Sequence, residues 1–139
     1  MLICFNGSRV LLYRVGKRRG TLLFRPPGGH IELFEHSNDT IRREIMEEVN
    51  SGISGLRQVA VLENIFWMRG SRHHEVDFMY YGRLTNQSLY KSDAVEIDED
   101  GRKIKGQWID ISKLSESNVV PQGAYRHMLG LMHNSKGRH

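Results

Sequence analysis

GGHIELFE at Gly28–Glu35, followed after seven residues by REIMEEV at Arg43–Val49, is the most informative stretch of this 139-residue chain. It places two glycines directly before a short helix whose last turns carry three carboxylates. The helix macrodipole leaves a partial negative charge at the C-terminus, where each acidic side chain is disfavoured by roughly 0.3 to 1 kcal/mol. Glu44 and Glu48 also stand four residues apart, a spacing at which like charges repel on a helix. We therefore expect this helix end to bind a cation.

The helix itself is predicted from its capping residues and its apolar repeat. The residues from Ser37 to Asp39 are types favoured at a helix N-terminus. An apolar residue then recurs every four positions, at Ile41, Ile45 and Val49, which gives one stripe along the helix. At ~100° per residue, the centre of the three carboxylates lies roughly 110° from this stripe. The stripe can therefore pack on a sheet while the carboxylates border a cleft.

The three carboxylates suggest a metal site. Glu44, Glu47 and Glu48, with loop carbonyl groups nearby, supply the hard oxygen ligands that Mg²⁺ or Mn²⁺ prefers. A metal there would neutralise phosphate charge and lower the pKa of a bound water, so that the water can attack phosphorus. For the acidic residues alone, a solvated helix face is the alternative interpretation. The glycine loop at this spacing favours the metal site, because glycine lets the backbone approach a ligand closely.

Outside this stretch, apolar alternation and turn residues predict short strands and one further helix. The strands are expected at 2–5, 10–15, 21–24, 59–67, 75–81 and 104–109, the last helix at 121–133, a polar loop at 17–20 and a frayed tail at 134–139. Strands followed by a central helix, further strands and a terminal helix favour a mixed sheet with helices on both faces. At this length we expect one domain, 1–139.

Charges are separated along the sequence by sign. The net charge is +4, yet residues 1–30 contain six Lys or Arg and no acidic residue, whereas residues 31–48 contain six acidic residues and two Arg. A nucleic-acid binder is expected to show an extended basic face with interleaved aromatic residues. The observed separation argues against a nucleic-acid partner. It suits a small anionic ligand bridged to the protein by a divalent metal.

Cysteine content and hydropathy exclude further classes of protein. Cys4 is the only cysteine, so neither an intramolecular disulfide nor a cysteine-based zinc site is expected. No apolar run approaches the ~18 residues of a membrane span. We therefore expect a cytoplasmic protein with no membrane partner.

The stretch from Gly29 to Ser51 resembles the signature box of the Nudix hydrolases. That pattern runs Gly, five residues, Glu, seven residues, Arg-Glu, an aliphatic residue, any residue, Glu-Glu, any residue, Gly and an aliphatic residue. The positions that match it in register are Gly29, Glu35, Arg43, Glu44, Ile45, Glu47 and Glu48. The last two positions differ. Asn50 replaces glycine and tolerates the left-handed conformation, whereas Ser51 replaces an aliphatic residue, for which Ile53 is expected to pack instead.

This resemblance implies an α/β protein with the Nudix-type α/β/α sandwich, in which a mixed β-sheet lies between helices. It implies that Glu44, Glu47 and Glu48 ligate Mg²⁺ or Mn²⁺, with the carbonyl group of Gly28 assisting. Glu44 would also be a candidate general base, and Arg43 would hold the glutamates by salt bridges. Arg43 and the three glutamates are therefore the expected catalytic residues.

Further acidic residues are implied around this set. Glu32 and Glu35 would support it from the loop before the helix. Family members often supply another acidic ligand from a loop before the late strand, and Glu99 is preferred among the acidic residues at 96–100. A solvated acidic turn is the open alternative for that cluster.

The expected substrate-binding residues are Arg25, Gly29 and Arg14. Arg25 stands immediately before the Pro-Pro-Gly-Gly turn, where its guanidinium can bind a phosphate through two hydrogen bonds. A structural role for Arg25 is the alternative. The run Lys17–Arg19 is interpreted as a solvated cluster.

The predicted function is divalent-metal-dependent pyrophosphohydrolysis of a nucleoside diphosphate linked to another moiety, such as a nucleoside triphosphate or ADP-ribose. A catalytically silent nucleotide-sensing module is one alternative, motivated by the Asn50-Ser51 end of the box. An RNA 5′-end pyrophosphohydrolase is another, supported by the basic N-terminal loop. The family resemblance also leaves a homodimer open. The identity of the nucleotide depends on residues outside the box.

Overall fold

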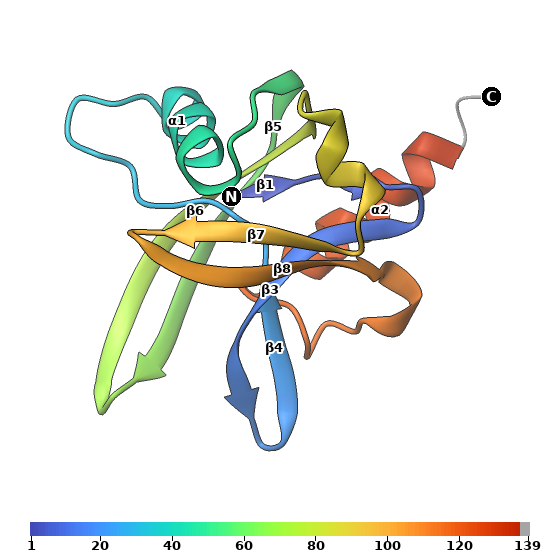
Figure 1. Cartoon of the computed structure of the whole chain (residues 1–139). Helices are drawn as coiled ribbons and strands as arrows, with labels where there is room; N and C mark the ends of the chain where they lie inside the picture. The colour runs from blue at the N-terminus through green and yellow to red at the C-terminus, as the bar shows by residue number, and fades with distance from the viewer. Residues whose placement is uncertain (137–139) are drawn as a thin grey trace.

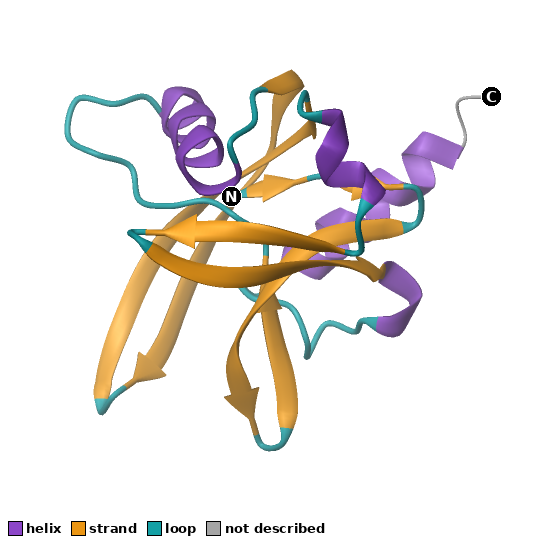
Figure 2. Cartoon of the chain, in the orientation of Figure 1, coloured by secondary structure: helices purple, strands orange, loops and turns teal. Residues whose placement is uncertain are grey.

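The computed structural model describes residues 1–136 and contains two α-helices and eight strands (Figures 1 and 2). The strands are β1 (Leu2–Ile3), β2 (Phe5–Asn6), β3 (Arg9–Arg18), β4 (Thr21–Arg25), β5 (Ile53–Met68), β6 (Ser71–Leu84), β7 (Ala94–Glu99) and β8 (Arg102–Asp110). The helices are α1 (Ser37–Val49) and α2 (Ala124–Lys136), with short 3-10 helices η1 (Gln87–Lys91) and η2 (Ile111–Lys113).

The strands form two sheets that the N-terminal segment joins. One sheet has the order β1-β6-β5, and the other has the order β2-β3-β8-β7, with β4 also paired to β3. β1 runs parallel to β6, whereas the other pairs are antiparallel. Only Cys4 separates β1 from β2, so the predicted strand at 2–5 contributes to both sheets. The arrangement is therefore mixed, as predicted.

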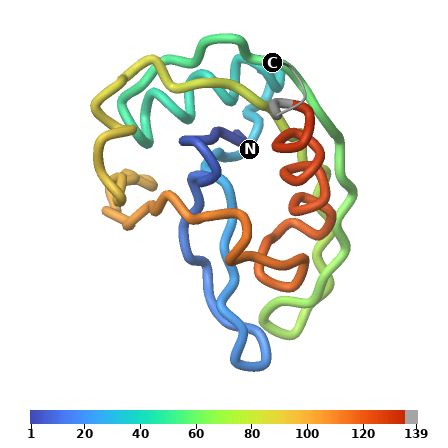
Figure 3. Tube along the Cα trace, turned by 90° about the vertical axis from the view of Figure 1, so that its right-hand side faces the viewer, coloured from blue at the N-terminus to red at the C-terminus, as the bar shows by residue number. Residues whose placement is uncertain are grey.

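The two helices pack on opposite faces of these strands (Figure 3). Side chains alternate along β3, so Leu11 belongs to the core beside α1 and Leu12 to the core beside α2. The apolar stripe of α1 is buried in the first core through Ile41, Ile45 and Val49. This two-sided packing confirms the predicted α/β/α sandwich.

The end of α1 accommodates both departures from the signature box. Asn50 adopts the left-handed conformation (φ 54°, ψ 51°), and its N–H donates to the Met46 carbonyl group at 3.1 Å. Ser51 is buried, and its hydroxyl donates to the carbonyl group of Gly52 and accepts from the backbone N–H of Asn86. Ile53 is buried in the core beside α1, where an aliphatic anchor was expected.

Several predicted boundaries differ from the structure. The strands expected at 59–67 and 75–81 are the middle of a longer hairpin, β5–β6, and 17–18 belongs to β3 rather than to a loop. α2 begins at Ala124 rather than at 121. It extends to Lys136, so residues 134–136 are helical rather than frayed, and 137–139 lie outside the described residues.

β7 was not predicted, because its charged residues suggested an acidic turn. Val95 and Ile97 alternate with acidic residues and are buried in the core beside α1. Pairing with β8 satisfies the backbone of this segment, so the acidic side chains can remain on its outer side. Among the helices of residues 1–136, none is long and apolar enough to cross a bilayer.

Replacing Asn50 tests its role as the residue that ends α1. Asn50→Ala is expected to lower the free energy of unfolding by about 1 kcal/mol, because alanine tolerates the left-handed conformation less well. Asn50→Gly is the matched control and should be neutral or stabilising, because glycine adopts this conformation freely. Urea unfolding measures both. Equal stability of the two variants would contradict this role.

Candidate functional site

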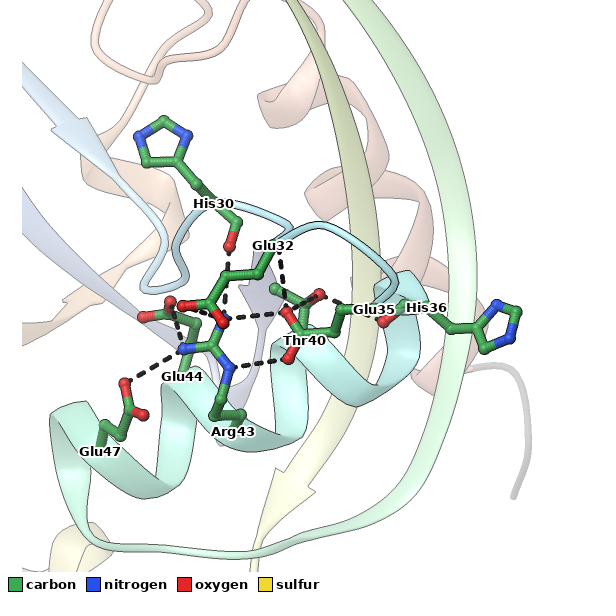
Figure 4. Close-up of polar contacts among 8 residues, drawn as sticks. All are labelled: His30, Glu32, Glu35, His36, Thr40, Arg43, Glu44 and Glu47. Atoms are coloured by element: carbon green, nitrogen blue, oxygen red, sulfur yellow. Dashed lines mark hydrogen bonds and ion pairs between the residues drawn. The ribbon is translucent and has the colours of Figure 1, made fainter.

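Arg43 is the centre of the polar network between α1 and the loop that precedes it (Figure 4). Its Nε donates to Glu35 Oε2 at 2.8 Å and its Nη2 to Glu35 Oε1 at 2.9 Å. The Thr40 hydroxyl also donates to Glu35 Oε1, at 2.7 Å. These hydrogen bonds from Arg43 and Thr40 lower the pKa of Glu35 to about 2. The two-pronged contact therefore ties the loop to the helix, and this support is lost only as the pH falls from about 4.5 toward 2.

Arg43 also holds two of the predicted metal ligands. Its Nη1 lies 3.0 Å from Glu44 Oε1 and 3.3 Å from Glu47 Oε2. Nη2 donates to the His30 carbonyl group at 3.4 Å, and Glu32 is a more distant ion-pair partner at 3.8 Å. Side-chain hydrogen bonds to Glu35 and Glu44 raise the pKa of Arg43, so it stays charged. The predicted role of Arg43 in holding the glutamates agrees with this geometry.

The loop needs glycine at positions 28 and 29 because neighbouring atoms approach its backbone too closely to leave room for a side chain. A Cβ atom on Gly29 would overlap the carboxylate of Glu44. Gly28 has φ +144°, and a Cβ there would lie 2.8 Å from the Met1 Cα atom. The loop therefore lies directly against Glu44 and the N-terminal strand.

Glu48 is the most perturbed acidic residue of the site. It is only 8% exposed, and its Oε2 atom is buried without a hydrogen-bond partner. Burial, and then the negative charge of Glu44, raise the pKa of Glu48 to about 8, although a hydrogen bond from the Gly28 backbone and the charge of Arg25 oppose the shift. A buried carboxyl group in this state favours binding of a cation, which would stabilise its ionised form.

Glu99 lies at the end of β7, near this carboxylate pair. Its charge raises the pKa of Glu48, which places the two within electrostatic reach. Glu96 and Asp98 are instead engaged by Lys103, at 3.3 and 3.0 Å. Among the acidic residues at 96–100, Glu99 is therefore the one best placed to join the site. It comes from a strand end, whereas the sequence predicted a loop.

The predicted substrate-binding arginines lie in different places. Arg25 projects over the ring of Tyr13, with 5.8 Å from its guanidinium carbon to the ring centroid, and its Nε is buried without a partner. Arg14 is exposed, and because neighbouring residues of β3 alternate between faces, it points away from the side of Tyr13. The structure brings Arg25 to the site and leaves Arg14 outside it.

A cavity of about 470 Å³ adjoins the carboxylates, between α1, the glycine loop, β4 and β6. Its polar lining includes Arg25, Ser37, Thr40, Glu75, Asp77 and Tyr80. Gly29 borders this cavity and lies against Glu44, so the cavity is next to the carboxylates, although none of the three glutamates lines it. The sequence analysis missed Asp77. The sequence did place Asp77 on the same side of a predicted strand as the apolar residue Met79. Met79 is fully buried, so an acidic residue on that side could have been recognised as a candidate for the site.

The donor set suits a divalent metal, but the predicted ligands are not assembled around one point. Within residues 1–136, no three His, Cys, Asp or Glu side chains are grouped as ready metal ligands. The Glu47 side chain is 59% exposed and contacts Arg43. Glu44 and Glu48 do lie beside the glycine loop, and the buried oxygen of Glu48 lacks a partner. Hard carboxylate oxygens of this kind fit Mg²⁺ or Mn²⁺.

The sequence of residues 1–128 matches the NUDIX domain family. The chain belongs to the Nudix family. A protein of Mycobacterium tuberculosis named MutT4 and described as a mutator protein is 33% identical over 97 residues, which cover 70% of this chain and 36% of that protein. The Nudix chain therefore spans about a third of the length of this curated relative.

Solved Nudix structures share the fold. The MutT NUDIX hydrolase of Burkholderia pseudomallei has a TM-score of 0.62 at 20% identity, covering 93% of this chain and 95% of that one. An Ap4A hydrolase of C. elegans has a TM-score of 0.57 at 12% identity, covering 98% and 93%. The predictions that the chain resembles the Nudix family and has an α/β fold are therefore confirmed.

Replacing Gly29 by alanine tests the contact between the loop and Glu44. The new Cβ would displace the carboxylate, which is the flexible end of a side chain, so the fold should survive. Displacing a reacting group by about 1 Å can cost about 100-fold in rate, so Gly29→Ala should reduce metal-dependent turnover by about that factor. Gly130→Ala in α2 is the control, because nothing lies within 4 Å of its Cβ position. Turnover in Gly29→Ala equal to that of the control would contradict this role.

The pKa of Glu48 predicts a pH-dependent stability of the metal-free protein. The folded state holds a proton on Glu48 that the unfolded state releases above its usual pKa of 4.5, so stability falls as the pH rises from 4.5 to about 8. Glu48→Gln should match the wild-type melting temperature near about pH 4, below the unfolded pKa, and exceed it near about pH 8.5, measured with EDTA present. If the difference in melting temperature between Glu48→Gln and the wild type stays constant across this pH range, the raised pKa of Glu48 is refuted. Glu116→Gln, at an exposed position, is the control.

Proposed function

We propose that this chain is a divalent-metal-dependent hydrolase that cleaves a phosphoanhydride bond in a nucleoside diphosphate linked to another moiety. The observation that carries this proposal is the Glu44–Glu48 pair beside the glycine loop, with a buried, unpartnered oxygen on Glu48. Membership of the Nudix family and the fold of its hydrolases support the reaction type. Nucleoside triphosphates and ADP-ribose are the proposed kinds of substrate.

The proposed metal ligands are Glu44, Glu48 and the Gly28 carbonyl group, with Glu99 as a further candidate. Glu47 would join them once its carboxylate leaves Arg43. A bound Mg²⁺ or Mn²⁺ would supply charge neutralisation at phosphate and a water of lowered pKa.

The protein's own groups would position the substrate and move the proton. Arg25 lines the cavity and its charge acts on Glu48, which supports a role for its guanidinium in binding a phosphate oxygen. Glu44, oriented by Arg43 at 3.0 Å, is the proposed acceptor for the proton of the attacking water. The cavity of about 470 Å³ is large enough to hold the remaining part of a nucleotide.

The catalytically silent alternative depended on the altered end of the signature box. α1 nevertheless ends in the expected left-handed residue, and the buried Ser51 is hydrogen-bonded. All the charged positions of the box remain in place. These observations favour an active enzyme.

Neutralising the buried glutamate tests the proposal. Glu48→Gln should lower the rate of product release by at least about 100-fold, because a metal ligand is lost while the shape of the side chain is kept. The assay uses Mg²⁺ or Mn²⁺ with ADP-ribose, dinucleoside polyphosphates, nucleotide sugars, and normal and oxidised nucleoside triphosphates. Running it in ¹⁸O water locates the attacked phosphorus.

Glu116→Gln is the matched control, because it makes the same chemical change on the surface. Circular dichroism should show both variants folded. An unchanged rate in Glu48→Gln would overturn the proposed metal-dependent hydrolysis.

A further inference from the structure

Three buried polar atoms lack a hydrogen-bond partner in the described part of the chain, namely Arg25 Nε, Glu48 Oε2 and Asp77 Oδ2. Arg25 and Asp77 line the same cavity, and the charge of Arg25 also acts on Glu48. Native proteins satisfy about 90% or more of their buried polar groups, and exceptions call for a specific explanation. The convergence of these three atoms indicates a place where a ligand supplies the missing partners.

Asp77 is the member of this group that the metal site does not explain. It lies on β6 and lines the cavity together with Glu75, two residues earlier on the same side of the strand. β1 pairs with β6 only at Tyr80 and Tyr81, and beside Asp77 the Met1 ammonium group donates to the Phe78 carbonyl group at 2.9 Å. Asp77 is thus part of the cavity wall, close to the charged N-terminus.

The chemistry of Asp77 restricts what it can bind. An ionised carboxylate only accepts hydrogen bonds, so its ligand must donate them. A substrate's ionised phosphates offer no donors, and Arg25 is the group suited to them. Asp77 therefore suits the nucleoside end of a substrate. Two nucleoside groups present a pair of adjacent donors, the ribose diol and the N1–H and 2-amino edge of guanine.

We propose that Asp77 determines substrate specificity by accepting hydrogen bonds from a pair of adjacent donors on the nucleoside part of the substrate. This inference rests on the proposed nucleotide hydrolysis and identifies the cavity beside the carboxylates as the nucleoside pocket. Burial and the neighbouring charge of Glu75 raise the pKa of Asp77, as expected for a carboxylate that lacks its partner.

The test measures binding separately from hydrolysis. Isothermal titration calorimetry with non-hydrolysable α,β-methylene analogues compares guanosine with inosine triphosphate, which lacks only the 2-amino group. A second comparison sets adenosine against 2′,3′-dideoxyadenosine triphosphate, which lacks the diol. The variant is Asp77→Asn, and the control is Asp93→Asn, an exposed residue that pairs with Arg9 and does not line this cavity.

The wild-type protein and the control should prefer the donor-bearing nucleotide of one pair by about 10- to 100-fold, the usual effect of hydrogen bonds to a charged group. Asp77→Asn should lose that preference while keeping its melting temperature, because the unpartnered oxygen makes no hydrogen bond within the protein. Asp77→Ala serves the same purpose should the asparagine variant fail to fold. If affinity differs between guanosine and inosine triphosphate, Asp77 binds the guanine edge. If it differs between adenosine and dideoxyadenosine triphosphate, Asp77 binds the ribose diol.

Two results would overturn the inference. One is a wild-type protein that discriminates within neither pair, and the other is a variant that retains the wild-type preference. Failure of the proposed hydrolysis has a different signature, because discriminating binding would persist while no nucleotide is turned over.

Discussion

The pairing of Arg43 with Glu35 is the interaction on which the rest of the site depends. Two short hydrogen bonds, at 2.8 and 2.9 Å, join a helix residue to the end of the glycine loop. The planar guanidinium fits the two carboxylate oxygens, which fixes orientation as well as distance. With the loop held there, Gly29 lies against Glu44 and Gly28 beside Glu48. A lysine would supply the charge without this geometry.

The energetically unfavourable features of the fold lie in this same region. Acidic residues gather where the helix dipole disfavours them, and Glu48 is buried with one oxygen unpartnered. Arg25 and Asp77 add two more unpartnered atoms nearby. Elsewhere the fold follows ordinary rules, with the apolar stripe of α1 buried and alternating strand residues sorted between two cores. Local departures of this kind are expected where a protein binds its ligand, because the ligand supplies the missing interactions.

Prediction from the sequence succeeded where the determining contacts are local. α1 was found because its four-residue apolar repeat lies within thirteen residues, although its N-cap is His36, which makes no side-chain capping bond, rather than a residue at 37–39. The ion pairs of Arg43 follow from the spacing of the signature box. β7 was missed because only its pairing with β8 makes an acidic segment a strand. The long β5–β6 hairpin was shortened because the residues beyond the predicted strands carry no regular apolar alternation, although Ile53 and Leu84 at its base are buried.

The sequence by itself determined the family, the helix with its carboxylates and the glycine loop beside them, because these depend on residues close together along the chain. The tertiary structure decided which distant residues join them. Arg25 from β4 and Glu99 from β7 act on Glu48, and Asp77 from β6 shares a cavity with Arg25, only because the sheets bring these strands together. It also left Arg14 outside, through the alternation of side chains along β3. Register and strand order are set by long-range pairing, which no local pattern specifies.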